Sequence, residues 1–361
     1  MTFNSLSEAR SRIDALDADI QRLINERAAV AEAIREIKAA AGEGGDHYRP
    51  GREAEVLKRA MERNTGPLSN EVIARLMREI MSACLALESP LTVAYLGPEG
   101  TYTQEAVYKH FGHAVEARAK RAIDEIFRDV DAGSTAYGVV PVENSIGGVV
   151  SNTLDALATA SLSICGEVLL PVHHHLLSKA DSIEQVRVIY SHGQSFAQCR
   201  RWIDATLPGV VQAVVASNGA AAQQVAETGE GAAIAGRAAG ERYGLKVLAS
   251  NIEDDPNNTT RFLIIGRKAS EATGRDKTSI VMSARQQRAG TLFELLAPFA
   301  DAGINLNKLE SRPSRRAPWD YNFFIDFDGH AEDPAVKAVL DRVCSNAGLF
   351  RVLGSYPQAV I

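Results

Sequence analysis

The sequence predicts a multidomain protein with an all-helical N-terminal domain, an α/β middle domain and a smaller α+β C-terminal domain. Three successive patterns along the chain indicate this division. Apolar residues first recur at helical spacing, then short aliphatic strands alternate with polar loops and helices, and finally the predicted order is strand, helix, two strands, helix and strand. The last order is typical of a ferredoxin-like unit. We expect the domains at residues 1–90, 91–268 and 277–361.

The N-terminal domain is predicted to consist of one long helix followed by two shorter ones. A glycine-containing break ends at Pro50, and Thr65-Gly66-Pro67 separates the second helix from the third. Three helices of such unequal length cannot bury the apolar side of the long one, so we expect a dimer that exchanges long helices. The apolar residues that recur at heptad spacing are Ile13, Ile20, Ile34, Leu16, Leu23, Val30 and Ile37.

Arg27 interrupts this apolar pattern at a position where an aliphatic residue is expected. A buried guanidinium without an anion costs several kcal/mol, roughly, in folding free energy. Lys38 lies about 20° from Arg27 around an ideal helix, so a second cation faces the same space. Arg27 could pair with a protein carboxylate or reach water. Two cations together favour an anionic ligand held between helices.

The overall composition excludes several function classes. The chain has 361 residues and a net charge of −6, and its densest basic cluster, residues 312–316, is too small for a nucleic-acid binder. The cysteines lack metal-ligand or redox spacing, and of the adjacent His173, His174 and His175 at most two side chains would converge. With no targeting segment or long apolar run, we expect a cytoplasmic protein with no membrane partner, metal or cofactor.

In the middle domain, four predicted strands each end in a polar loop that precedes a helix. Ligands of open parallel sheets bind beyond the carboxyl ends of the strands, where free N–H groups at helix N-termini attract anions. No phosphate-loop lysine or dinucleotide glycine fingerprint follows any of these strands. We therefore expect a small polyanion, although each polar loop residue could instead cap a helix. The loops are Gly97–Thr103, Glu143–Gly148, Ser191–Gln194 and Ser217–Asn218.

Four short motifs, which follow one another through the predicted middle and C-terminal domains after the helical domain, resemble the bifunctional chorismate mutase and prephenate dehydratase family of phenylalanine biosynthesis. They are Gly97–Thr103, Pro141–Ser145, Asn258–Phe262 and Glu310–Pro313. The resemblance covers nearly the whole chain. It implies a helical, dimerising mutase domain, a two-lobed dehydratase domain like the periplasmic binding proteins, and a regulatory ACT domain of ferredoxin-like fold.

For the first domain, the resemblance implies rearrangement of chorismate to prephenate, a pericyclic step that needs electrostatic stabilisation and no nucleophile. Cys84 and Glu88 depart from the family pattern, as does Arg49. An ionised Glu88 would repel the charge that grows on the ether oxygen, so we expect mutase activity to fall as pH rises. The implied substrate-binding residues are Arg10, which reaches the partner's site, and Arg27, Lys38, Arg52, Glu53, Cys84 and Glu88, with Lys38 and Glu88 closest to the chemistry.

For the second domain, the resemblance implies loss of carbon dioxide and the ring hydroxyl from prephenate to give phenylpyruvate. Aromatisation drives this reaction, so the protein needs to orient two carboxylates and assist departure of the hydroxide. Thr260 is the predicted hydrogen-bond donor to that hydroxide. The candidate carboxylate or hydroxyl binders are Thr101, Asn144, Ser145, Ser191, Gln194 and Arg261.

For the third domain, the resemblance implies that phenylalanine binds as an effector and inhibits the enzyme. Two alternatives remain: the dehydratase could act on arogenate, or the chain could be a ligand sensor that has lost catalysis. The predicted effector-binding residues are Gly290, Thr291, Leu292, Glu310, Ser311, Arg312 and Pro313.

Overall fold

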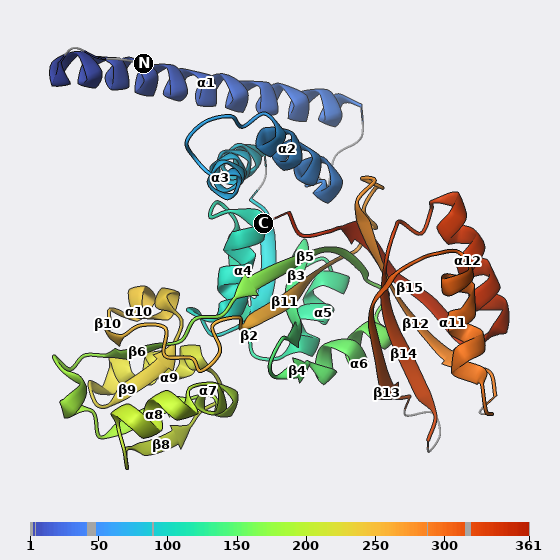
Figure 1. Ribbon diagram of the computed structural model, residues 1–361. Helices are drawn as coiled ribbons and strands as arrows, with labels where there is room; N and C mark the ends of the chain where they lie inside the picture. The colour runs from blue at the N-terminus through green and yellow to red at the C-terminus, as the bar shows by residue number, and fades with distance from the viewer. Residues whose placement is uncertain are drawn as a thin grey trace.

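The structure is a computed structural model, and it describes residues 3, 5–41, 48–88, 90–286, 288–314 and 319–360. Figure 1 shows a long helix lying across two shorter ones, a two-lobed α/β region below them, and a C-terminal sheet with two helices at one side. The predicted multidomain fold class is therefore confirmed. Within the described residues, no helix is long and apolar enough to cross a bilayer.

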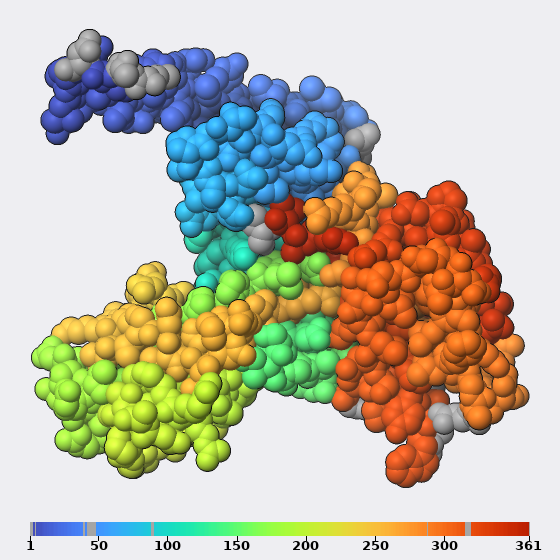
Figure 2. Space-filling model, viewed as in Figure 1, coloured from blue at the N-terminus to red at the C-terminus, as the bar shows by residue number. Residues whose placement is uncertain are grey.

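The N-terminal region contains the three helices predicted from periodicity. The second helix begins with Pro50, whose missing N–H is not needed at a helix N-terminus. The long first helix projects as an arm from the rest of the molecule (Figure 2), and its seven heptad residues are all at least 40% exposed. The helices are α1 (Leu6–Ala40), α2 (Pro50–Glu62) and α3 (Asn70–Glu88).

The first lobe of the α/β region is built on a mixed sheet of order β2-β1-β3-β11-β5, with β4 paired to β3. β1 runs parallel to both neighbours, whereas β11 is antiparallel to β3 and β5. The sheet therefore differs from the open parallel sheet that the strand–loop–helix pattern suggested. Its elements are β1 (Thr92–Leu96), α4 (Tyr102–Phe111), β2 (Glu116–Lys120), α5 (Ile123–Asp131), β3 (Tyr137–Asn144), β4 (Gly148–Val149), α6 (Ser151–Thr159), β5 (Ser163–Pro171) and β11 (Thr259–Gly266).

The second lobe has its own sheet, of order β10-β6-β9-β7-β8. The chain enters this lobe after β5 and returns to the first lobe at β11, so two crossing segments join the lobes. The elements are β6 (His175–Ser178), η1 (Ile183–Gln185), β7 (Val188–Ser191), α7 (Gly193–Gln198), α8 (Arg200–Thr206), β8 (Val211–Val214), α9 (Asn218–Thr228), β9 (Ala232–Ala235), α10 (Arg237–Tyr243) and β10 (Lys246–Ala249).

The C-terminal domain is a four-stranded antiparallel sheet of order β13-β14-β12-β15 with two helices. Ile280 and Met282 of β12 pack with the helices, whereas Val281 between them joins the core of the first lobe. This alternation gives the sheet two covered faces, so the domain is joined to the first lobe by a continuous core. Its elements are β12 (Asp276–Ala284), α11 (Thr291–Asp301), β13 (Leu306–Pro313), β14 (Tyr321–Asp328), α12 (Pro334–Asn346) and β15 (Ala347–Pro357).

Candidate active sites

Asn144 and Thr260 form a hydrogen-bonded pair at the boundary between the two α/β lobes. They are register partners on the antiparallel strands β3 and β11. Asn144 Nδ2 donates to Thr260 Oγ1 at 2.9 Å and to Asn258 Oδ1 at 2.7 Å. Because the Thr260 oxygen accepts from Asn144, the hydroxyl proton is left to donate elsewhere, and an accepted hydrogen bond strengthens the hydroxyl as a donor.

The second lobe completes this cluster with two glutamines from α7. Gln194 Nε2 and Gln198 Nε2 each donate to Asn144 Oδ1 at 3.3 Å. The same oxygen accepts from the backbone N–H groups of Ile146 and Gly147, so the Asn144 side chain is held on several sides. The two glutamines stand one helical turn apart, which lets both reach the same atom. The cluster thus forms only where the two lobes meet.

His174 lies on the crossing segment between β5 and β6 and connects this segment to the same cluster. Its Nε2 lies 2.8 Å from Gln198 Oε1, and its Nδ1 lies 2.9 Å from the Tyr102 hydroxyl. Since an amide oxygen can only accept, this contact assigns the ring proton to Nε2. Burial lowers the pKa of His174, which favours the neutral ring. Gln198 Oε1 also accepts from Asn258 Nδ2 at 3.2 Å, so one network runs from Tyr102 to Thr260.

The three consecutive histidines do not converge on a common point. His173 Nδ1 contacts Glu253 Oε1 at 2.8 Å, and His175 Nδ1 accepts from the backbone N–H of Asn251. Each histidine therefore makes its contacts in a different part of the segments that join the lobes. Among the described residues, no group of three or more histidine, cysteine, aspartate or glutamate side chains is arranged to hold a metal ion.

Three other predicted dehydratase residues make contacts within the protein. The Thr101 hydroxyl lies within hydrogen-bond distance of the Leu96 and Pro98 carbonyls, in the loop that follows β1. Ser145 Oγ accepts from the backbone N–H of Thr259 at 3.0 Å, which ties the turn after β3 to the start of β11. Ser191 is fully buried in the second lobe. The structure brings Ser145 next to the Asn144–Thr260 pair and does not bring Ser191 there.

Arg261 is also not part of this cluster, unlike the prediction that it binds a substrate carboxylate. Its guanidinium is held by Glu167 and Asp326 and donates to the Tyr356 hydroxyl at 2.9 Å. Successive strand residues point to opposite faces, so Arg261 points away from the side that carries Thr260. The guanidinium lies instead at the contact with the C-terminal domain.

The predicted mutase cations fall on and around the partly covered side of α1. Arg27 and Lys38 are half-buried on this helix, and among the described residues neither forms an ion pair with a carboxylate. Arg10 is exposed near the start of α1. Lys38 lines a cavity of about 740 Å³ together with Arg52 and Arg49. Glu55, Glu62 and Glu271 line the same cavity. Arg52 is paired with Glu55 at 2.6 Å and Arg49 with Glu271 at 3.9 Å, so these two cations already have carboxylate partners in the chain.

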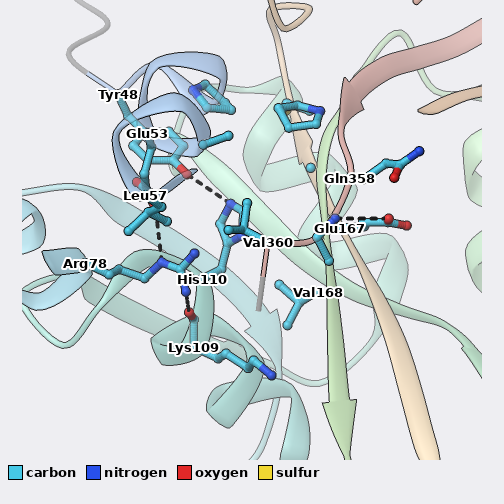
Figure 3. Close-up of a pocket in the computed structure, with 16 residues that line it drawn as sticks. Tyr48, Glu53, Leu57, Arg78, Lys109, His110, Glu167, Val168, Gln358 and Val360 are labelled. Carbon is cyan, nitrogen blue, oxygen red and sulfur yellow. Dashed lines mark hydrogen bonds and ion pairs between the residues drawn. The ribbon is translucent and has the colours of Figure 1, made fainter. Parts of the chain in front are cut away.

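Glu53 lies in a different cavity from these cations (Figure 3). Its carboxylate accepts from Arg78 Nε at 3.1 Å, and Arg78 in turn donates to the backbone carbonyl of Lys109 at 2.7 Å. Burial raises the pKa of Glu53, although Arg78 opposes the shift. The structure therefore does not bring Glu53 together with Lys38 and Arg52, as its predicted role in binding a substrate hydroxyl requires.

The remaining mutase candidates lie on α3. Cys84 is buried, with 4% of its surface exposed. Glu88 is the last residue of the helix, and its side chain lies outside the described part of the structure. Its predicted influence on the pH dependence of the mutase therefore stays a prediction.

The predicted effector residues lie at two places in the C-terminal domain. Gly290 has a φ of 86° and immediately precedes α11, and the Thr291 hydroxyl donates back to the preceding turn. Leu292 lies in the first turn of α11. Along β13, the Arg312 side chain contacts Asp155 of the first lobe at 3.3 Å. The other members of the second motif are Glu310, Ser311 and Pro313.

Gln198, Asn258 and His174 belong to the network but were not predicted as site residues. Asn258 is fully buried beside Thr260, and its place in the Asn258–Phe262 motif was the available signal. The signal for Gln198 was its spacing of four residues from Gln194, which puts both on one helix face. Nothing local distinguishes His174 from its two neighbours, because its role depends on how the crossing segments fold.

Comparison with protein families gives three matches along the chain. Residues 9–89 match the chorismate mutase type II model, residues 93–270 the prephenate dehydratase model and residues 278–345 the ACT domain model. The order of these matches follows the three regions described above.

Full-length relatives and a solved structure extend these matches. Bifunctional chorismate mutase/prephenate dehydratases from Stutzerimonas stutzeri and Pseudomonas aeruginosa are each 52% identical to this chain, over 99% of both sequences. A crystal structure of prephenate dehydratase in complex with L-Phe from Arthrobacter aurescens is 36% identical, covers 74% of this chain and 90% of its own, and has a TM-score of 0.70. This chain belongs to the family of bifunctional chorismate mutase/prephenate dehydratases.

Proposed function

We propose that the chain converts chorismate to prephenate in its helical domain and prephenate to phenylpyruvate between its two α/β lobes. The observation that carries the second step is the Asn144–Thr260 hydrogen bond at the lobe boundary, which leaves the Thr260 hydroxyl proton free to donate. The proposed domain boundaries are residues 1–90, 91–268 and 277–361.

In the proposed dehydration, Thr260 donates a hydrogen bond to the ring hydroxyl of prephenate as that group leaves. The bond between the ring carbon and its carboxylate breaks, carbon dioxide departs, and the released electron pair aromatises the ring and expels the hydroxide. A threonine hydroxyl is a weak acid, so Thr260 polarises the leaving group, and the released hydroxide takes up its proton from the buffered solvent. Asn144 holds the Thr260 oxygen in place, and Gln194 holds Asn144.

Closure of the two lobes over the substrate is the proposed source of water exclusion. Glu99 of the first lobe is paired with Arg242 of the second, and Glu99 O accepts from the Tyr243 hydroxyl at 3.0 Å. Removal of bulk water strengthens each hydrogen bond to the leaving hydroxide. We propose Thr101, Ser145 and Gln194 as contacts of the substrate carboxylates, and we assign Ser191 and Arg261 no contact with substrate.

In the proposed mutase step, cations on one chain bind the two carboxylates of chorismate and hold it in its reactive conformation. Arg27, Lys38 and Arg52 supply these charges, with Arg10 contributed by a second copy of the chain. Cys84 and Glu88 of α3 complete the proposed pocket. The exposed apolar face of α1 supports a homodimer as the working form, because an isolated chain would leave that face in water.

Phenylalanine is the proposed inhibitor, bound by the C-terminal domain at residues 290–292 and 310–313. A ligand shifts an equilibrium only when it binds one conformation more tightly than the other, so inhibition requires a less active arrangement that phenylalanine prefers. The experiment that tests the whole proposal is incubation of the full-length protein with chorismate, with and without phenylalanine. Appearance of prephenate followed by phenylpyruvate supports it. Binding of chorismate without turnover would instead identify a sensor.

A further inference from the structure

Two register pairs stand side by side where β3 and β11 approach the lobe boundary. Thr260 is paired with Asn144, and Arg261 is paired with Glu143. Successive residues of a strand point to opposite faces of the sheet. The first pair forms the proposed dehydratase centre, and the second pair contacts the C-terminal domain. Each member of the proposed centre thus has, as its immediate neighbour in sequence, a residue held by the C-terminal domain.

Arg261 connects β11 to two other strands through charged and polar contacts. Its Nε donates to Glu167 of β5 at 2.8 Å, and a second nitrogen pairs with Asp326 of β14. The Arg261 side chain is 11% exposed, and those of Glu167 and Asp326 are 2% and 10% exposed. Burial by itself lowers the pKa of Arg261, but Tyr356, Asp326 and Glu167 raise it overall, so the guanidinium stays charged. Such a pair is rigid because separating it leaves a buried charge unpaired.

The groups around Arg261 satisfy one another almost completely. Lys277 Nζ lies 2.9 Å from each oxygen of Glu167, so two cations face the two carboxylates Glu167 and Asp326. Ser279 Oγ donates to Asp326 Oδ1 at 2.6 Å and lies 2.7 Å from the Tyr356 hydroxyl. A buried network in which each charge is paired has one favoured geometry, so movement of the C-terminal sheet would also displace β11.

Glu143 provides a second connection, from β3 to β13. Lys308 Nζ lies 2.9 Å from Glu143 Oε2, and the Lys308 side chain is 10% exposed. Four residues further along β13, Arg312 contacts Asp155 in the middle of α6. β13 also carries the predicted effector motif from Glu310 to Pro313. The strand with these predicted effector residues is therefore bound to the residue that directly precedes Asn144.

We propose that the Lys308–Glu143 pair and the Arg261–Glu167–Asp326 network position the Asn144–Thr260 pair for dehydration and transmit the state of the C-terminal domain to it. The inference rests on the proposed function of that pair. These five charged residues are positioning residues, since none of them contacts the proposed reacting atoms. A ligand that moves β13 would change the donor geometry of Thr260 through residues one position away.

The first test uses Lys308→Met, Glu143→Gln and the double variant in the full-length protein. Methionine keeps the apolar stem of the lysine and removes its charge. We expect each single variant to lower the dehydratase kcat about tenfold, with little change in KM, and to raise the phenylalanine concentration for half inhibition by roughly tenfold, a size typical of allosteric coupling. The double variant should match the single variants, because all three lose the same ion pair.

Two internal controls accompany this test. Mutase activity of the same samples should stay unchanged, which reports that the helical domain of each variant is folded. Lys337→Met removes an exposed lysine on α12 of the same domain and should leave kcat and phenylalanine response unchanged. Additive effects of Lys308→Met and Glu143→Gln would show that the two residues act separately and would overturn the proposed pair.

The second test uses Asp326→Asn and Tyr356→Phe, which weaken the contacts of Arg261. Asp326→Asn should reduce kcat and phenylalanine sensitivity more than Tyr356→Phe, since it removes a charge. Tyr356→Phe removes a single hydroxyl, so this variant still tests the role of the network if Asp326→Asn does not fold. Wild-type kcat and inhibition in both Lys308→Met and Tyr356→Phe would overturn the inference, and a wild-type enzyme that phenylalanine does not inhibit would overturn its regulatory half.

Failure of the proposed function would look different. If Thr260→Val retained full dehydratase activity, the Asn144–Thr260 pair would not be the dehydratase centre. If Thr260→Val lost activity while the Lys308, Glu143 and Tyr356 variants behaved as wild type, the proposed dehydratase centre would be supported. Only the proposed positioning role of the charged residues would then be rejected.

Discussion

The proposed dehydratase centre and the proposed mutase centre are built in contrasting ways. In the dehydratase centre, side chains from both lobes of one chain are joined by hydrogen bonds from Tyr102 to Thr260. In the mutase region, Arg27 and Lys38 are half-buried without an ion pair among the described residues, and the apolar face beside them is exposed. The dehydratase centre is a neutral polar network within one chain, whereas the proposed mutase site depends on cations that bind an anionic substrate and, in our proposal, on Arg10 of a second copy.

Removal of the Thr260 hydroxyl should produce the largest effect. It tests the proposed dehydratase centre, which is formed within one chain. Thr260→Val keeps the branched shape of the side chain and removes the donor. We expect the dehydratase kcat to fall by about 10³-fold, within the range for loss of a proton donor, while mutase activity is retained. Both activities are measured on the same sample from chorismate consumption and phenylpyruvate formation.

The matched control for this variant is Thr259→Val, at the preceding position of β11. Thr259 contacts Ser145 through its backbone, so the substitution leaves those contacts in place. Equal losses in the two variants would mean that any valine disturbs the strand, and would remove the case for Thr260 as donor.

Neutralising Arg27 should have the reverse effect on the two activities. Arg27→Met keeps much of the volume and removes the charge, so we expect the mutase kcat/KM to fall by about 10²-fold and the dehydratase to be unaffected. Arg22→Met serves as the control, because Arg22 is exposed and pairs with Asp19 and Glu26 of its own helix. A mutase that tolerates Arg27→Met would place the chorismate site elsewhere.

A charge on the exposed apolar face of α1 tests whether the mutase centre needs a second copy. Ile20 is 53% exposed in the single chain, and Ile20→Glu should dissociate the dimer because a buried glutamate is strongly unfavourable. Without the partner's Arg10, mutase activity should fall by an amount comparable with one lost cation, up to about 10²-fold, and dehydratase activity should persist. Sedimentation equilibrium measures the dissociation.

Ala18→Glu adds the same charge on the opposite side of α1 and should leave the dimer intact. If Ile20→Glu remained dimeric at dilution, the exposed face of α1 would not be the main contact between copies.

The smallest expected effect concerns the junction of the two regions, where His110 Nε2 lies 3.0 Å from the Tyr48 hydroxyl. Burial lowers the pKa of His110 to about 3, with Arg78 adding to the shift. The unfolded chain binds this proton near pH 6.5, so the contribution to stability is complete above that pH and is lost as pH falls toward 3. Between pH 7.5 and 5 the loss is about 2 kcal/mol.

His110→Gln removes this titrating group and should flatten the dependence of the free energy of unfolding on pH across that interval. Urea unfolding at several pH values measures it. His113→Gln is the control, because His113 is exposed on the same side of the junction. An equal pH dependence in wild type and His110→Gln would show that His110 is not the group that titrates.

Much of the fold followed from local patterns. The heptad spacing and the glycine and proline breaks predicted the three helices, with α2 starting at the expected Pro50. Alternation of strands and helices predicted the α/β class, and the motif that contains Thr260 was recognisable as a short run of residues. Each of these signals is contained within a few turns of helix or one strand, where neighbouring side chains decide the conformation.

The antiparallel pairing of β11 with β3 was decided only by the tertiary structure. Asn144 and Thr260 lie 116 residues apart, so no local period predicts that they face each other. The same pairing turns Arg261 toward Asp326, which corrects its predicted role, and the docking of α2 turns Glu53 toward Arg78. The amino-acid sequence by itself determined which chemical groups this protein carries and on which elements they lie. Which groups meet depended on the packing of distant segments, because hydrogen bonds and ion pairs form only between atoms that the whole fold brings within a few ångströms.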